Sequence, residues 1–170
     1  MRKTRLLIIV VAVALVLVGV RYFTGDCSRY GRFTVRGSSM AGIVDEGDTI
    51  NVRMGYYGCH EPERGDVALI KYSGNADPLV KKIVGMPGDA LTFAKDDYGG
   101  YLVLNGVPLL TTKAEFFYID PTAQKLLGSY LRGGKIPPGV YLILGNQPVG
   151  STDSRDFGML GKKQFLGKVY

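Results

Sequence analysis

The sequence predicts an all-β domain, built as a coiled, mostly antiparallel sheet or a partly open barrel, preceded by one N-terminal transmembrane helix. Three observations lead to this fold class. Short apolar segments recur between turn residues, the chain contains 24 glycines and 8 prolines, and one long apolar run lies near the N-terminus. A length of 170 residues allows one domain and a tail but not two ordinary domains.

The N-terminal apolar run, residues 6–20 (LLIIVVAVALVLVGV), has no charged residue and follows a basic start. Such a run fits either a secretory signal or a short membrane anchor. A signal that is removed should end in small residues, whereas here Arg21, Tyr22 and Phe23 follow. We therefore expect a retained anchor. Basic residues on both sides do not fix its orientation.

The chain divides into four parts. We expect residues 1–5 to form a basic start, which is cytoplasmic if the β-rich domain lies outside, residues 6–23 the transmembrane anchor, residues 24–32 a polar tether and residues 33–170 the β-rich domain. Asn105-Gly106 predicts a tight hairpin over residues 102–110, since both residues tolerate positive φ. A short helical turn is expected over residues 124–130. The remaining expected strands cover residues 49–53, 67–72, 79–84, 90–94, 101–104, 116–119, 139–144 and 165–169.

The net charge of +6 does not indicate nucleic-acid binding, because lysines and arginines are scattered along the chain. Basic residues flank the apolar run, so the phospholipid membrane is the expected partner. Cys27 and Cys59 lie on the domain side of the anchor, where an oxidising compartment would allow a disulfide. A zinc site that adds His60 is not expected, because an adjacent Cys-His pair does not match structural zinc spacing.

The candidates for catalysis are a serine and a lysine rather than a histidine. His60 is the one histidine and lies in a turn-like segment, and no G-x-S-x-G or S-x-x-K motif occurs. Residues 79–84 (LVKKIV) place two lysines among apolar residues, where burial lowers the pKa of an amine until it can accept a proton. On a strand Lys81 and Lys82 point to opposite faces, and alternation does not choose between them. Lysines that protect an edge strand from aggregation are the alternative interpretation.

Four motifs, in order, resemble those of type I signal peptidases. Residues 37–40 (GSSM) resemble the serine box, and residues 64–67 (RGDV) the next box. Residues 81–89 (KKIVGMPGD) resemble the lysine box closely. Residues 151–158, with the pattern SxDSRxxG, resemble the last box. The resemblance thus extends over most of the expected β-rich domain.

The resemblance implies a role for each matched side chain. Ser39 would attack the scissile carbonyl, and Lys81, the first of the two lysines, would take its proton. Ser151 corresponds to the serine that hydrogen-bonds and orients the catalytic lysine. Asp153 and Arg155 correspond to a supporting ion pair. Because they are two residues apart, an extended segment would project both to one side, where they would hold the Ser151 loop rigid.

Two positions depart from the family pattern. Some relatives have a serine two residues before the nucleophile, and its hydroxyl helps to bind the oxyanion, whereas this chain has Gly37. The amide of Ser39, aided by Ser38, is then expected to carry that role. Residues 41–43 (AGI) replace the proline and threonine of many relatives, so the binding groove is expected to differ in shape.

The function implied by the resemblance is that of a serine endopeptidase without metal or cofactor, which removes N-terminal signal peptides from exported preproteins. Its single anchor would lie in the cytoplasmic membrane, with the domain on the extracytoplasmic side. A conjugal-transfer peptidase that matures a pilin subunit is an alternative, because this compact chain is similar to such relatives. A non-catalytic anchored β-domain that binds exported proteins is a third hypothesis, although intact candidates for nucleophile and base argue against it.

Overall fold

The structure is a computed structural model that describes residue 27 and residues 29–73 and 77–170. The expected basic start (1–5), the expected anchor (6–23) and much of the expected tether (24–32) lie outside the described residues. Among the described residues, no helix is both long and apolar enough to cross a membrane.

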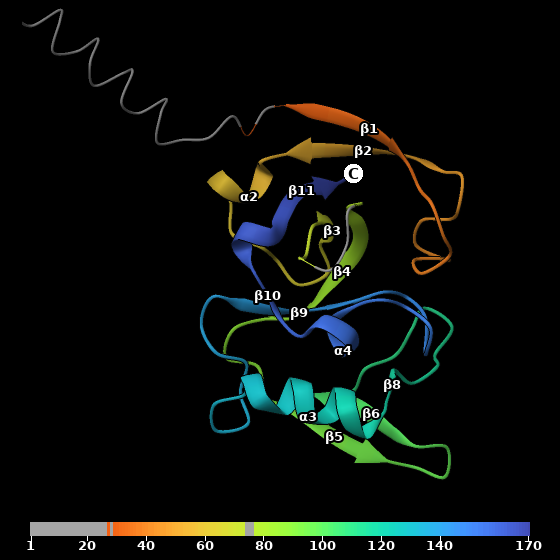
Figure 1. The fold of residues 1–170 in the computed structure, drawn as a ribbon, viewed down its shortest axis with the longest axis vertical. Coiled ribbons are helices and arrows are strands. Elements are labelled where there is room, and N and C mark those ends of the chain that lie inside the picture. The colour runs from red at the N-terminus through yellow and green to blue at the C-terminus, as the bar shows by residue number, and fades with distance from the viewer. Residues whose placement is uncertain (1–26, 28, 74–76) are drawn as a thin grey trace, which may run out of the picture.

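Seven strands form the larger of two sheets, and every neighbouring pair in it is antiparallel (Figure 1). Among the described residues no pairing joins its edge strands β1 and β10, so the sheet stays open. The expected all-β, antiparallel architecture is therefore confirmed, in its open form. In spatial order the strands are β1 (Tyr30–Thr34), β2 (Thr49–Met54), β11 (Phe165–Val169), β3 (Val67–Ile70), β4 (Leu79–Gly85), β9 (Val140–Leu144) and β10 (Leu160–Gly161).

The smaller sheet confirms the predicted hairpin. Asn105 has a φ of 52° and Gly106 a φ of 81°, so both turn residues adopt the positive φ that a tight hairpin requires. Leu104 pairs with Val107 across this turn. The sheet contains β5 (Leu91–Lys95), β6 (Gly100–Leu104), β7 (Val107–Pro108) and β8 (Tyr118–Ile119).

The helices are short, except for one that is longer than the sequence analysis predicts. α3 (Pro121–Tyr130) begins three residues before the expected turn, because Asp120 caps it by accepting a hydrogen bond from Ala123 N at 2.8 Å and Pro121 occupies its first turn. Its buried Leu127 belongs to the same apolar cluster as the smaller sheet, and Figure 1 shows α3 lying across β5 and β6. The other helices are α2 (Tyr56–Cys59), α4 (Ser154–Phe157) and a 3₁₀ turn at Lys162–Gln164.

The first strand, β1, begins inside the segment expected to be a tether. The glycine in YGRFT reads as a turn residue, but Gly31 lies within the strand and opposite Val52. A Cβ atom at Gly31 would come within 2.8 Å of the Phe33 ring. Glycine therefore makes room for an aromatic side chain here, and does not mark a turn.

A disulfide joins Cys27 to Cys59, with 6.3 Å between their Cα atoms. It fixes the chain just before β1 to the end of α2, and Arg53 Nε adds a hydrogen bond of 2.6 Å to the carbonyl oxygen of Cys27. The sequence did not decide whether these two cysteines pair, and the structure shows that they do. His60 stacks on Tyr56 with 4.1 Å between ring centroids, and its Nδ1 lies 3.0 Å from Tyr56 O.

The central strands β3, β4 and β9 form a rigid base for the residues described next. Ile83 pairs with Ile143, and both are fully buried. The register shifts at Gly85, where a Cβ atom would come within 2.7 Å of both Ile136 and Leu142. Close packing on both faces fixes β4, and with it the side chains that this strand presents.

Candidate active site

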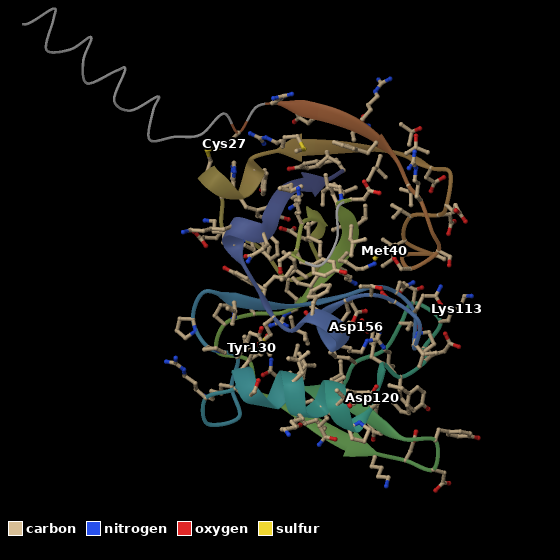
Figure 2. All side chains as sticks on the ribbon, in the orientation of Figure 1. Cys27, Met40, Lys113, Asp120, Tyr130 and Asp156 are labelled. Carbon is tan, nitrogen blue, oxygen red and sulfur yellow. A yellow bond between two sulfur atoms is a disulfide. The ribbon has the colours of Figure 1, made fainter. Side chains whose placement is uncertain are left out.

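Ser39 lies in a compact loop between β1 and β2. Ala41 N donates to Ser38 O at 2.9 Å, and Val44 N donates to Met40 O at 3.1 Å. Met40, labelled in Figure 2, is only 1% exposed and anchors this loop in the core. Ser39 itself is half-exposed. The loop therefore holds a serine hydroxyl in a fixed place that a substrate can reach.

Lys81, on β4, contacts that hydroxyl. Its Nζ lies 2.5 Å from Ser39 Oγ, at hydrogen-bond distance, and the residue is only 2% exposed. Lys82 is half-buried and, as its neighbour on a strand, points to the opposite face. The structure thus brings Ser39 and Lys81 together, which the alternation of residues alone could not predict.

Burial changes the ionisation of Lys81. The pKa of this amine is lowered from 10.5 to about 8 as the net result of desolvation, which lowers it, and of three nearby charges: Asp153 raises it, Arg155 lowers it and Asp156 raises it. Desolvation is the largest of these effects, because an ammonium ion loses its hydration in a dry site. The neutral amine is therefore accessible near neutral pH.

A cavity of about 550 Å³ opens beside the pair, and both Ser39 and Lys81 line it. It lies between β1 and the beginning of β4. Its other walls combine apolar side chains, including Phe33, Val35, Ile50, Leu69 and Leu79, with the charged Arg32, Arg36 and Asp77. A cavity of this size, with apolar walls and a few polar groups that converge, is typical of a substrate site.

Asp153 and Arg155 form the expected ion pair, but on a different backbone. They lie at the start of α4 and not on an extended segment, and Asp153 caps the helix by accepting from Arg155 N. Arg155 Nε and Nη2 donate to the two carboxylate oxygens at 2.9 and 2.8 Å. Arg155 also donates to the carbonyl oxygens of Tyr118, Pro148 and Gln147. A buried pair that is hydrogen-bonded on all sides stiffens the preceding loop.

Ser151 lies close to the backbone of Ser39, but the expected hydrogen bond from Ser151 to Lys81 is not formed. Its Oγ is buried and has no hydrogen-bond partner among the described residues. A Cβ atom on Gly145 would come within 2.6 Å of Ser39 O and closer still to Ser151 Oγ, so both serines pack against this glycine. A buried hydroxyl without a partner costs about 1–3 kcal/mol. The orienting role of Ser151 remains a prediction.

A strap of residues, 145–147, follows β9 and connects the ion pair to the serine loop, and none of the four sequence motifs includes it. Gly145 N donates to Asp153 Oδ2 at 3.0 Å, and Asn146 N donates to Ser39 O at 2.7 Å. Gln147 Nε2 donates to Ser38 O at 2.9 Å. The available signal was the polar Gly-Asn-Gln sequence directly after a buried strand and before the last motif.

Asn146 is the centre of this strap. It is 8% exposed, and its Nδ2 donates to Ala41 O at 2.7 Å and to Thr112 Oγ1 at 2.6 Å, while its Oδ1 accepts from Thr112 N at 3.0 Å. These bonds use both ends of the amide. Asn146 therefore holds the serine loop against the loop that contains Thr112.

The two departures from the family pattern have structural reasons. Gly37 has a φ of 83° and Gly42 a φ of 85°, a region that side chains disfavour. A Cβ atom on Gly42 would also lie 3.0 Å from Thr112 Oγ1. The Ser39 N–H donates to no other group among the described residues, so it is available to an oxyanion, whereas Ser38 is exposed.

The arrangement fits the class of serine hydrolases in which a lysine amine replaces histidine as the base. Comparisons with known proteins agree with this class. The model of the family described as "Signal peptidase, peptidase S26" matches residues 2–170. The chain therefore belongs to the signal peptidase family, peptidase S26, and it is a serine endopeptidase. This membership argues against the hypothesis of a non-catalytic binding domain.

The sequence identity between this chain and individual relatives is low. Signal peptidase I of Bacillus caldolyticus is 29% identical over 150 residues, which cover 82% of this chain and 77% of that protein. Signal peptidase IB of Staphylococcus aureus (strain COL) is 29% identical over 151 residues, covering 81% of this chain and 74% of that protein. A signal peptidase I structure from Enterococcus faecalis V583 is 27% identical, with a TM-score of 0.47, and covers 65% of this chain and 98% of that chain.

The lowered pKa of Lys81 predicts how activity depends on pH. Only the neutral amine can accept a proton, so kcat/KM should rise by about tenfold per pH unit on the acidic side and level off above a midpoint near the pKa of about 8. Initial rates with a synthetic signal-peptide substrate across this range measure the midpoint. A profile that keeps rising to the ordinary lysine pKa of 10.5 would contradict the desolvation of Lys81.

The hydrogen bonds of Asn146 predict a second effect. In Asn146→Asp the shape is kept, but a carboxylate replaces the donor to Ala41 O, so the serine loop should shift. We expect kcat to fall by roughly ten- to a hundredfold with KM little changed. Asn51→Asp makes the same chemical change at an exposed position and serves as the control. Equal kcat values for Asn146→Asp and wild type would show that the strap does not position Ser39.

Proposed function

We propose that this protein is a membrane-anchored endopeptidase that removes N-terminal signal peptides from exported proteins, with Ser39 as nucleophile and Lys81 as general base. One observation carries the proposal. Lys81 is almost fully buried, and its Nζ lies at hydrogen-bond distance from the hydroxyl of Ser39 in a cavity open to a substrate. A structural lysine would ordinarily be exposed or paired with an acid.

The proposed reaction has two halves. Neutral Lys81 accepts the proton of the Ser39 hydroxyl as Oγ attacks the scissile carbonyl carbon, and the resulting ammonium donates that proton to the departing amine. The C–N bond breaks, and an ester links the signal peptide to Ser39. Lys81, again neutral, then takes a proton from water, and the hydroxide attacks the ester. The ammonium returns that proton to Ser39 as the signal peptide leaves.

The oxyanion of each tetrahedral intermediate would bind to the amide of Ser39. Its N–H has no partner within the described residues, and Asn146 N holds the serine loop by donating to the carbonyl oxygen of Ser39. An amide that is fixed before the reaction stabilises developing charge without reorganising. Ser38 is exposed, so any contribution from its hydroxyl requires a rotamer that turns toward the substrate.

The cavity beside Ser39 and Lys81 offers a place for an extended substrate. Residues 79–81 of β4 pair with β3 on one side, whereas β9 pairs with β4 only from Lys82 onward. The backbone of residues 79–81 therefore has an open edge, to which a substrate strand can add. Apolar walls around Ser39 favour the uncharged residues that precede a signal-peptide cleavage site.

The proposed location is the cytoplasmic membrane, with one anchor at residues 6–23 and the domain on the extracytoplasmic side. The Cys27–Cys59 disulfide supports this side, because disulfides persist in oxidising compartments. The disulfide also attaches the domain to the chain a few residues after the anchor. A site held near the bilayer meets membrane-inserted substrates at a higher effective concentration.

The test is cleavage of a preprotein with a small-x-small site by the detergent-solubilised full-length chain. Ser39→Ala and Lys81→Ala should each lose activity by at least about a hundredfold, because nucleophile and base act as a unit. Lys82→Ala, a change of the same kind at the neighbouring residue, should remain active. Cleavage by Ser39→Ala at the wild-type rate would contradict the proposed mechanism.

The same assay separates the alternative of a dedicated pilin peptidase. A general signal peptidase should process several unrelated preproteins at similar rates. Cleavage of a pilin precursor alone, with unrelated preproteins left intact, would favour the alternative.

A further inference from the structure

A second cavity, of about 210 Å³, adjoins the strap, and Ser39 is not among the residues that line it. Gly145 and Asn146 line it, and Asn146 N is also hydrogen-bonded to Ser39 O. Lys82 contributes the charged group, Thr111 and Thr112 add polar groups, and Leu110 and Phe117 form an apolar part of the wall. We call this cavity the Lys82 pocket. Ligand pockets usually hold roughly 300–1,000 Å³, so this one suits a single side chain of a longer substrate.

The pairing of β4 shows how a substrate would reach the Lys82 pocket. A substrate strand that follows the open edge of residues 79–81 toward Lys81 meets the end of β9, because Lys82 pairs with Leu144. Beyond Lys81 the edge is occupied by β9, so the substrate chain has to turn away from β4 at Lys81. This is also where the side chain of Lys81 contacts Ser39. The residues after the scissile bond would then pass Gly145 and Asn146, which belong to the wall of the Lys82 pocket.

The charge of Lys82 is not paired with an acidic group within the described part of the chain. Among the described residues no ion pair includes Lys82, and no acidic side chain lines the pocket. Glu115, in the neighbouring loop, interacts instead with Thr111 Oγ1 at 3.4 Å. Lys82 is half-buried, so its charge is screened less by water than that of an exposed lysine. An incoming carboxylate would therefore be attracted, and an incoming ammonium repelled.

We propose that the Lys82 pocket receives one of the first residues of the mature protein and that Lys82 selects an acidic side chain at that position. This inference rests on the proposed function, because it assumes that the substrate is cut at Ser39. The paired lysines then divide two tasks between the two faces of β4. Lys81 faces the reacting bond, and Lys82 faces the part of the substrate that leaves as product.

The test compares peptides that share one signal sequence and differ only after the cleavage site, with Glu, Gln or Lys placed in turn at each of the first few mature positions. At one position the wild type should cleave the Glu peptide faster than the Lys peptide, by roughly two- to fivefold in kcat/KM, as for a partly exposed charge pair. Lys82→Gln should bring this ratio close to one, and Lys82→Glu should invert it.

Lys113→Gln is the matched control, because Lys113 is exposed in the neighbouring loop and does not line the pocket. It should keep the wild-type ratio. A ratio that is the same in wild type and Lys82→Gln would overturn the assignment of Lys82, and so would a preference that Lys113→Gln abolishes. If the wild type cleaves none of the peptides, the proposed function fails, and the pocket assignment fails with it.

Discussion

The burial of one lysine amine against one serine hydroxyl is the constraint on which the rest of this structure depends. An ammonium ion in an apolar site is unstable, so Lys81 loses its proton more easily than an exposed lysine does. A neutral amine becomes useful only if it is held still, because it has one lone pair to direct at the hydroxyl. Strand β4 provides that rigidity, since β3 and β9 flank it and Ile83, two residues further on, is fully buried.

The serine half of the site is held by a chain of interactions that runs through the strap. Arg155 fixes Asp153, Asp153 accepts from Gly145 N, and the next residue, Asn146, binds the loop around Ser39. The ion pair is therefore connected to the nucleophile through hydrogen bonds of the Gly145 and Asn146 amides, and not by direct contact between its side chains and Ser39. This connection gives the last motif a physical role even though its serine, Ser151, forms no hydrogen bond to Lys81 in the structure.

Features that depend on local chemistry were predictable from the sequence. Asn105 and Gly106 tolerate the positive φ that a tight hairpin turn requires, so the pair indicated the turn, and most of the strands follow from their apolar residues. The assignment of Lys81 came from resemblance, because alternation treats Lys81 and Lys82 alike until the neighbouring strands decide which face is buried. β1 was missed because Gly31 serves packing rather than a turn. The hydrogen bonds of Asn146 join segments far apart in the chain, and no local pattern predicts them.

The most direct test of this account is to titrate Lys81 itself, by NMR of the full-length protein in detergent with isotope-labelled lysine. Lys81→Arg assigns the signal, because this variant lacks only that resonance. The account predicts a titration midpoint for Lys81 near 8. A midpoint at the ordinary lysine value of 10.5 would show that the amine stays charged at neutral pH, and it would contradict the role of Lys81 as a base.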